Sequence, residues 1–148
     1  MAGMKVVANQ GGGQDPGYEW SVLTLNVAHD EAAKMLTADQ YDHEADLVKQ
    51  LARHADPTHS STLSVCAVED FYELRDKGGV LGNMNVRTFF CLDRKAKARA
   101  IIVLGVIKKQ NDGPTPLGDK IRMRYRKRKY EEGVYGMATA MVKQREKE

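Results

Sequence analysis

The fold is decided by the stretch Phe71-Tyr72-Glu73-Leu74-Arg75 and by three similar runs around it, at residues 63–68 (LSVCAV), 86–92 (VRTFFCL) and 99–108 (RAIIVLGVIK). All four runs are short and rich in β-branched and aromatic residues, which is typical of strands. The charged segment 93–98 lies between the last two runs and predicts a hairpin. Because consecutive strands joined by hairpins lie side by side, we expect an antiparallel sheet.

Before these runs, the spacing of apolar residues changes along the chain from that of a strand to that of a helix. Residues 20–27 are expected to form a first strand, and residues 31–36 a short helix. The sequence Thr37-Ala38-Asp39-Gln40 has the form of a capping box and predicts the start of a second helix, which Pro57 ends. The two helices would cover one face of the sheet, which gives an α+β fold of four to five strands whose other face stays open.

The chain of 148 residues has the length of one domain, and 42% of its residues are hydrophobic, which is enough for a single core. We expect this domain to span residues 18–130. Residues 1–17 contain three consecutive glycines and are expected to be a flexible tail with at most a short strand at residues 4–8. Residues 131–148 are expected to be an extension, in which residues 137–147 have the pattern of a further short helix.

Charge is distributed unevenly along the chain, although 23 Lys+Arg and 20 Asp+Glu leave a net charge of only +3. Residues 1–74 contain 4 basic and 12 acidic side chains, and residues 75–148 contain 19 basic and 8 acidic ones. The densest basic segment is a predicted helix at residues 117–130, where cations are interleaved with tyrosines. Cations attract phosphate and aromatic rings stack on bases, so a nucleic-acid interface is favoured. An acidic protein partner and a solvated helix face are the alternatives.

Several kinds of site and targeting segment have no support in the sequence. The four histidines lack the spacing of metal-binding motifs, so we predict no metal site and expect each histidine at the surface or in a loop. Cys66 and Cys91 lie in predicted strands and are expected to be free thiols. Nucleotide-binding and esterase motifs are absent from the sequence. Because the sequence also lacks a long apolar run and a secretory signal, we expect a soluble cytoplasmic protein.

Basic residues in the predicted strands are the candidates for a functional site. Arg75 ends one strand, Arg87 lies inside the next, and Lys108-Lys109 ends the most apolar one. A charge in the middle of a strand is costly unless that face is wet or the charge is paired. A structural ion pair, for example between Arg75 and either Glu73 or Asp70, is therefore the alternative to a binding role.

The order of these motifs resembles the RelE/ParE toxin superfamily. Its members have a tyrosine-glutamate-leucine-arginine strand, an arginine followed by aromatic residues, an apolar strand ending in paired lysines, and a threonine-proline before a final helix. This chain has these features at residues 72–75, 87–90, 100–109 and 115–116. The resemblance covers roughly residues 20–130 and looks closest to the HigB-type branch and its phage-derived relatives.

The resemblance implies a RelE-like fold and the toxin of a type II toxin–antitoxin pair. RelE- and HigB-like members are endoribonucleases that usually cut messenger RNA in the ribosomal A site, without a metal or another cofactor. The 2′-hydroxyl of the substrate attacks the adjacent phosphorus, so the protein has to move protons and stabilise the charged phosphorane. The implied partners are a cognate antitoxin, the ribosome and its message, and no membrane.

The resemblance also implies roles for individual residues. Arg87 would contact the scissile phosphate with support from Arg75, and Lys108 or Lys109 would clamp a phosphate or transfer a proton. The residues expected to bind RNA are Arg122, Arg124, Tyr125, Arg126, Lys127, Arg128 and Tyr130. RelE has lysines on the strand that here begins at Phe71, so its general base is not carried over. A ParE-like inhibitor of DNA gyrase and a catalytically degenerate RNA-binding module are the alternative functions.

Overall fold

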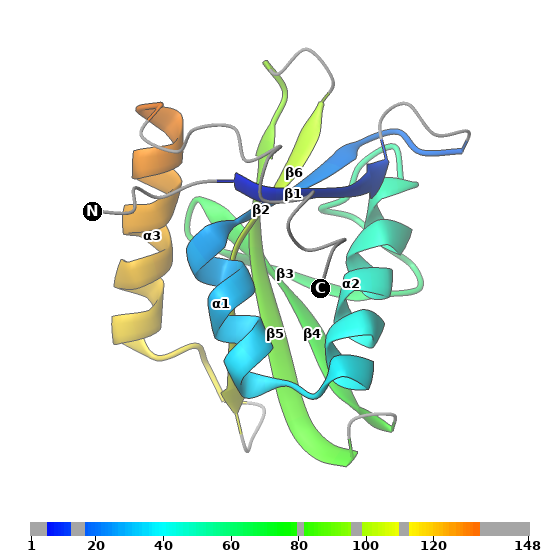
Figure 1. The fold of residues 1–148 in the computed structure, drawn as a ribbon, viewed down its shortest axis with the longest axis vertical. Helices are drawn as coiled ribbons and strands as arrows, with labels where there is room; N and C mark the ends of the chain where they lie inside the picture. The colour runs from blue at the N-terminus through cyan, green and yellow to red at the C-terminus, as the bar shows by residue number, and fades with distance from the viewer. Residues whose placement is uncertain (1–5, 13–16, 80–81, 96–98, 110–112, 134–148) are drawn as a thin grey trace.

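A computed structural model describes residues 6–12, 17–79, 82–95, 99–109 and 113–133 of the chain (Figure 1). In chain order, the elements are β1 (Val6–Gly12), β2 (Ser21–Leu25), α1 (Asn26–Met35), α2 (Ala38–Ala52), β3 (Ser64–Val68), β4 (Phe71–Gly79), β5 (Gly82–Asp93), β6 (Ala100–Lys109) and α3 (Leu117–Glu131). None of the helices in this described part is long and apolar enough to cross a membrane. The helix pattern at residues 137–147 lies outside the described residues.

The six strands form one mixed sheet in the order β1-β2-β6-β5-β4-β3. β5 pairs antiparallel with both β4 and β6, as the hairpin predictions require. The expectation of a wholly antiparallel sheet of four to five strands is wrong, because β2 lies parallel to β6 and β1 adds a sixth strand. Parallel neighbours need a long crossover connection, and here α1, α2 and the hairpin strands lie between the two paired segments in the chain.

Two glycine-rich segments are more regular than the sequence suggests. β1 covers Val6–Gly12 and pairs antiparallel with β2, so it is longer than the strand expected at residues 4–8. The pairing between β1 and β2 contains two register shifts, which are common at sheet edges. The second segment lies around residues 78–83, where β4 continues to Gly79 and β5 begins at Gly82.

The two helices after β2 begin in different ways. Thr37 and Gln40 form both hydrogen bonds of the predicted capping box at the start of α2, at 2.9 and 3.2 Å. α1 instead begins at Asn26, directly after β2, and includes residues predicted as the end of a strand. Ala28 and Ala32 are four residues apart and both buried, so helical spacing places small apolar side chains against the sheet.

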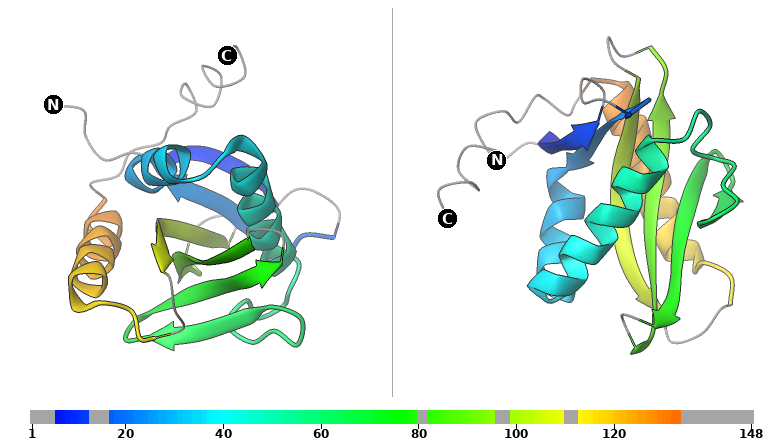
Figure 2. Two further views of the ribbon diagram at one scale, coloured as in Figure 1. Left: turned by 90° about the horizontal axis from the view of Figure 1, so that it is seen from below. Right: turned by 90° about the vertical axis from the view of Figure 1, so that its right-hand side faces the viewer.

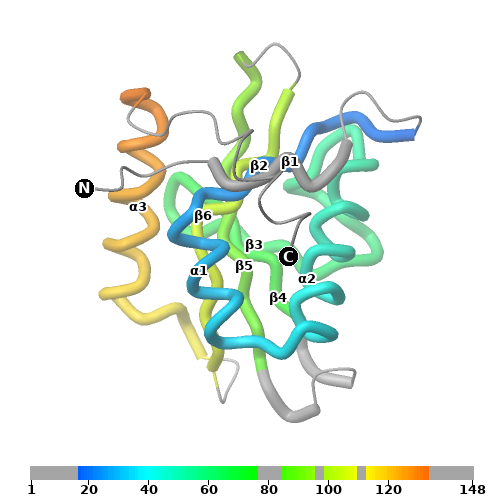
Figure 3. Tube along the Cα trace, viewed as in Figure 1, coloured from blue at the N-terminus to red at the C-terminus, as the bar shows by residue number. Residues whose placement is uncertain are grey.

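Helices lie on both faces of the sheet. α1 and α2 cover one face, while α3 packs against β6 from the other face and lies beside α1 (Figures 2 and 3). Gly105 of β6 permits this contact, because an added Cβ would collide with the side chains of Met123 and Arg126. The expectation that one whole face stays open is therefore wrong. The core between the layers includes the fully buried Val22, Leu25, Leu51, Phe71, Leu74, Phe89, Phe90, Ile101, Ile102 and Leu104, each stabilising by about 1.5–3 kcal/mol.

One edge of β6 is covered by helices instead of a strand. β2 and β6 pair only through residues 21–24 and 100–103. Beyond this point α1 packs along β6, and Arg126 of α3 donates a hydrogen bond to the carbonyl oxygen of Leu104 at 2.9 Å. Within the described part of the chain, helix packing and this side chain take the place of a further strand.

Candidate functional site

The four basic residues predicted at the catalytic centre do not all share one face of the sheet. Arg75 and Arg87 are direct neighbours across β4 and β5, and Arg87 pairs in turn with Ile107 on β6. Because side chains alternate along a strand, Lys109 lies on the same face as Ile107, whereas Lys108 lies on the opposite face. The sheet thus brings Arg75, Arg87 and Lys109 together, on the face against which α3 packs.

The two arginines are joined through a buried carboxylate. Arg75 donates from Nε and Nη2 to Oε1 of Glu73, at 2.7 and 2.6 Å. Thr115 donates to the other oxygen, Oε2, at 2.5 Å. Arg87 donates from Nη1 to Thr115 Oγ1 at 3.1 Å and from Nη2 to the carbonyl oxygen of Gly113 at 2.6 Å. We call the four side chains Glu73, Arg75, Arg87 and Thr115 the arginine cluster.

Burial decides which members of the arginine cluster can contact a ligand. Arg87 is 0% exposed and Glu73 is 1% exposed, whereas the Arg75 side chain is 19% exposed. In this structure the guanidinium of Arg87 is enclosed and held by residues 113–115, so it is not presented to a phosphate at the surface. A buried charge needs close partners. The ion pair considered as the alternative, Arg75 with Glu73, is present.

Sequence reasoning considered Glu73 as a partner of Arg75 but missed the contact between Glu73 and Thr115. They are 42 residues apart in the chain, so no local pattern links them. The signal that could have drawn attention to Thr115 is the threonine-proline motif shortly after the paired lysines. Thr115 follows the end of β6 closely in the chain and contacts Arg87 of the neighbouring strand β5.

Arg126 is a structural residue rather than an exposed RNA-binding one. It is 8% exposed, and its guanidinium forms a two-pronged ion pair with Glu31 of α1, at 2.8 and 2.6 Å. Arg122 approaches the same carboxylate at 3.4 Å. Together with its hydrogen bond to Leu104, this ion pair lets Arg126 connect α3, β6 and α1. Arg126 is therefore engaged within the molecule and is not exposed for the predicted RNA contact.

Most other charges of α3 also have partners within the molecule. The ion pairs are Arg122 with Asp119, Arg124 with Glu69, Lys127 with Asp70 and Glu131, and Lys129 with Glu132. Tyr130 donates to Asp93 at 2.7 Å, and burial together with this bond raises the pKa of the tyrosine hydroxyl. Acidic residues of the first half of the chain thus neutralise part of the basic helix. The uneven charge of the sequence is in part an internal complementarity.

The outward side of α3 carries exposed groups. Leu117, Ile121 and Tyr125 follow at intervals of four residues and share one side of the helix, where they are 69, 53 and 45% exposed. We call them the α3 stripe. Arg128 is also exposed, and Lys129 Nζ lies 5.4 Å from the centre of the Tyr125 ring. Among the predicted RNA-binding residues, Tyr125 and Arg128 are the two that are exposed rather than half-buried or buried.

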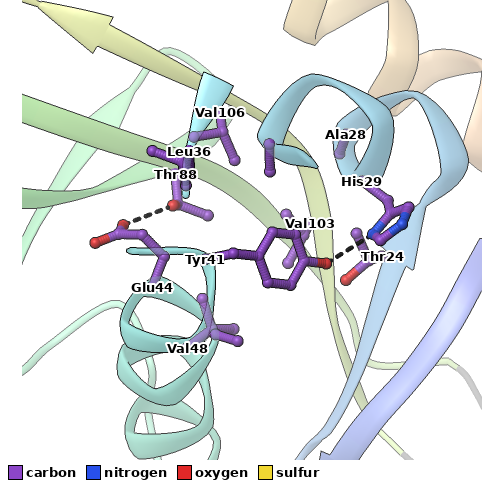
Figure 4. Close-up of a pocket in the computed structure, with 12 residues that line it drawn as sticks. Thr24, Ala28, His29, Leu36, Tyr41, Glu44, Val48, Thr88, Val103 and Val106 are labelled. Carbon is purple, nitrogen blue, oxygen red and sulfur yellow. Dashed lines mark hydrogen bonds between the residues drawn. The ribbon is translucent and has the colours of Figure 1, made fainter. Parts of the chain in front are cut away.

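A pocket lies on the opposite face of the sheet, beneath α1 and α2 (Figure 4). The empty volume of the pocket is about 340 Å³, which includes open solvent at its mouth. The lining is mainly apolar, and His29 Nδ1 lies 2.8 Å from the Tyr41 hydroxyl at one side of it. Glu44 reaches the pocket from α2 and accepts a hydrogen bond from Thr88 of β5 at 3.2 Å.

Glu44 also belongs to a second polar cluster, with His43 and Asp76. Glu44 is 5% exposed, and burial together with the nearby Asp76 carboxyl raises its pKa to about 9. His43 Nε2 lies 2.8 Å from Asp76 Oδ2. The prediction that every histidine lies at the surface or in a loop is wrong for His43, whose side chain is 26% exposed at the contact between α2 and β4.

Among the described residues, two regions on the α3 side of the sheet are partly or fully exposed. One is the end of the sheet around Arg75 and Lys109, and the other is the outward side of α3 around Tyr125 and Arg128. Both combine positive charge with groups that can contact a phosphate or a base. No family model, no curated protein and no solved structure matches the chain.

Proposed function

We propose that this protein is the toxin of a type II toxin–antitoxin pair and acts in the cytoplasm as an endoribonuclease on ribosome-bound messenger RNA. The observation that carries the proposal is the shared sheet face of Arg75, Arg87 and Lys109, set by the register of β4, β5 and β6. The resemblance of the sequence motifs to RelE- and HigB-type toxins supports the choice of substrate. Cleavage would proceed by attack of the substrate's own 2′-hydroxyl, without a metal.

Charge at this end of the sheet favours a phosphate. The Glu73 carboxylate lies near two arginines, Arg75 and Arg87, and Lys109 adds a third cation to the same face. The excess positive charge attracts the RNA backbone and stabilises the additional charge of a phosphorane. The Arg75 side chain is partly exposed, at 19%, and the planar guanidinium group is suited to phosphate oxygens.

The buried and the exposed cations take different roles in this proposal. Arg75 donates to the scissile phosphate, and Lys109 clamps the phosphate or transfers a proton. Arg87 is a positioning residue, because it holds Thr115, which holds Glu73, which in turn fixes the guanidinium of Arg75. Lys108 has no part in the chemistry, since it points to the opposite face.

The outward side of α3 extends the proposed RNA surface. Tyr125 offers an exposed ring on which a base can stack, and Arg128 offers an exposed guanidinium for a phosphate. The α3 stripe also gives a protein partner an apolar contact flanked by cations. An antitoxin segment that is amphipathic and acidic fits this side of the helix and would cover the RNA surface at the same time.

The decisive experiment incubates the purified protein with translating ribosomes and maps the ends of the message. We expect cuts within the coding region that carry a 5′-hydroxyl. Arg75→Ala and Lys109→Ala are each expected to lower the cleavage rate by about 10²-fold, the loss typical of a transition-state donor. Lys108→Ala is the matched control, with the same residue type one position away, and should retain cleavage. Full activity in both test variants would refute the assignment of this face.

A second function, RNA binding without cleavage, is favoured by one observation. Arg87 is enclosed beneath residues 113–115, and the only carboxylate of the arginine cluster is engaged by Arg75 and Thr115. This leaves no carboxylate of the cluster ready to accept the 2′ proton. Retained ribosome or RNA binding with intact messages would favour this function. Intact messages together with a DNA damage response would instead favour a ParE-like gyrase inhibitor.

A further inference from the structure

Three potential metal ligands meet between α2 and β4, away from the arginine cluster. His43 and Glu44 are consecutive residues of α2, and Asp76 lies on β4. One ligand atom from each residue lies within 4.8 Å of the other two. Asp76 follows Arg75 in the chain, so its side chain points to the opposite face of the sheet, beneath α2.

The hydrogen bonding of Glu44 provides an independent sign of a missing ligand. Its side chain is nine-tenths buried or more, since the residue is 5% exposed. Thr88 donates to Oε1, whereas Oε2 is buried and receives no hydrogen bond from a described nitrogen or hydroxyl group; the other polar neighbour of this carboxyl is the carboxyl of Asp76. Buried polar atoms are almost always paired, so an orphaned carboxylate oxygen needs an explanation. Oε2 is the Glu44 oxygen free to take a ligand from the side of Asp76.

The charges around this oxygen make a cation the suitable ligand. Two carboxyl groups, of Glu44 and Asp76, lie against one imidazole, and the Asp76 side chain is only 11% exposed. His43 Nε2 lies 2.8 Å from Asp76 Oδ2 and can compensate one negative charge at most. Taking two carboxylates out of water without further positive charge is costly. In the absence of a cation, the raised pKa of Glu44, about 9, lets the pair hold a proton instead.

We propose that His43, Glu44 and Asp76 bind a divalent transition-metal ion of the zinc class. One imidazole nitrogen and two carboxylate oxygens are a donor set that suits zinc, whereas calcium and magnesium prefer oxygen ligands alone. Zinc bonds of about 2.0–2.2 Å place tetrahedral ligand atoms about 3.3–3.6 Å apart. Ligand atoms within 4.8 Å reach this spacing by side-chain rotation. A water molecule or a small ligand would complete the coordination.

The bound ion would connect elements that are distant in the sequence. It would hold α2 against β4 on the side of the sheet opposite Arg75, and Glu44 would link it to the pocket beneath α1 and α2. Because the ion binds only the folded arrangement, it raises the stability of the fold. Its site is separate from the proposed RNA surface, so its test does not depend on ribonuclease activity.

The test is a calorimetric titration of chelator-treated, dialysed protein with zinc sulfate, with metal content measured after removal of free ions. We expect one zinc ion per chain and a higher melting temperature with zinc. His43→Ala, Glu44→Gln and Asp76→Asn are each expected to weaken binding at least tenfold. His59→Ala is the matched control, because His59 also pairs with an aspartate, Asp56, at 2.9 Å but is 85% exposed and belongs to no three-ligand group among the described residues. This control should keep the affinity unchanged.

A measurement on the unaltered protein guards against variants that fail to fold. Cobalt(II) substituted for zinc should give visible absorption bands of the intensity expected for four- or five-coordinate nitrogen and oxygen ligands. The same bands should disappear when zinc is added. The proposal is overturned if wild-type protein binds neither ion at micromolar concentration. It is equally overturned if the His59→Ala variant loses binding as strongly as the His43→Ala variant.

Discussion

Replacing Arg87 by alanine is expected to act mainly on the stability of the fold. The wild-type guanidinium is fully buried, donates hydrogen bonds of 3.1 and 2.6 Å, and lies 4.0 Å from a carboxylate oxygen of Glu73. Removing one partner from a buried ionic network costs about 3–5 kcal/mol, because the groups left behind stay desolvated. Arg75 and Thr115 still engage Glu73 in the variant, so we expect a loss near the lower limit, about 3 kcal/mol.

The assay is urea unfolding followed by the fluorescence of Trp20, the single tryptophan, which is 1% exposed and therefore reports on the core. For a chain of this length, about 3 kcal/mol corresponds to a fall of roughly 6–12 °C in melting temperature. Arg128→Ala removes an exposed arginine and serves as the control, with an expected change within about 0.5 kcal/mol. Cleavage by the folded fraction of the Arg87→Ala variant should be measured under the same conditions.

One result would refute this reasoning. If Arg87→Ala unfolds within about 1 kcal/mol of the wild type and yet loses RNA cleavage by about 10²-fold, then Arg87 contacts the substrate directly. Residues 113–115 would then have to move away from the guanidinium during the reaction. The pattern expected of a buried positioning residue is a large loss of stability with only a partial loss of cleavage by the folded molecules, because Thr115 and Glu73 still hold Arg75.

Three further predictions concern the packing of α3 and the core. Arg126→Ala should lower the free energy of unfolding by about 2–4 kcal/mol, because the buried ion pair with Glu31 is lost; a thermal melt unchanged from wild type would contradict the structural role. Gly105→Ala should cost about 1–3 kcal/mol by displacing Met123, and denaturant unfolding measures it. Cys91, a free thiol as predicted, has a pKa raised to about 12 by burial, against 9.0 in the unfolded chain. Between these values the unfolded state binds fewer protons than the folded state, so stability falls as pH rises from 9 to 12. In the Cys91→Ala variant, the free energy of unfolding should fall less steeply between pH 9 and 12. An equally steep fall in both proteins would show that the Cys91 thiol is not its cause.

Local signals predicted most of the elements. The strands β3 to β6 and the helices α2 and α3 lie where the runs of β-branched residues, the capping box and the basic segment place them. The prediction failed where the pairing of strands that are distant in the chain decides the structure. β1 is glycine-rich and is a strand because β2 lies beside it, and the parallel contact of β2 with β6 depends on how the whole chain crosses over.

The candidate site was harder to predict for the same reason. The sequence identified Arg75, Arg87 and Lys109 as noteworthy, and the register brings these three together. It did not reveal which charges are neutralised internally. Arg126 meets Glu31 across 95 positions of the chain, a separation that no local window covers. The sequence of a basic helix does not reveal whether its cations contact a polyanion or the acidic half of the same protein.

The covered edge of β6 has a consequence for how copies of this protein behave in solution. An uncovered strand edge offers backbone groups to the strand of another molecule and so promotes self-association into fibrils. Here α1 lies along the apolar second half of β6, and the guanidinium of Arg126 occupies the carbonyl oxygen of Leu104. Loss of this one side chain would therefore do more than loosen a helix. It would leave the Leu104 carbonyl at the edge of the most apolar strand open to a strand of another molecule, so we expect the variant to aggregate more readily.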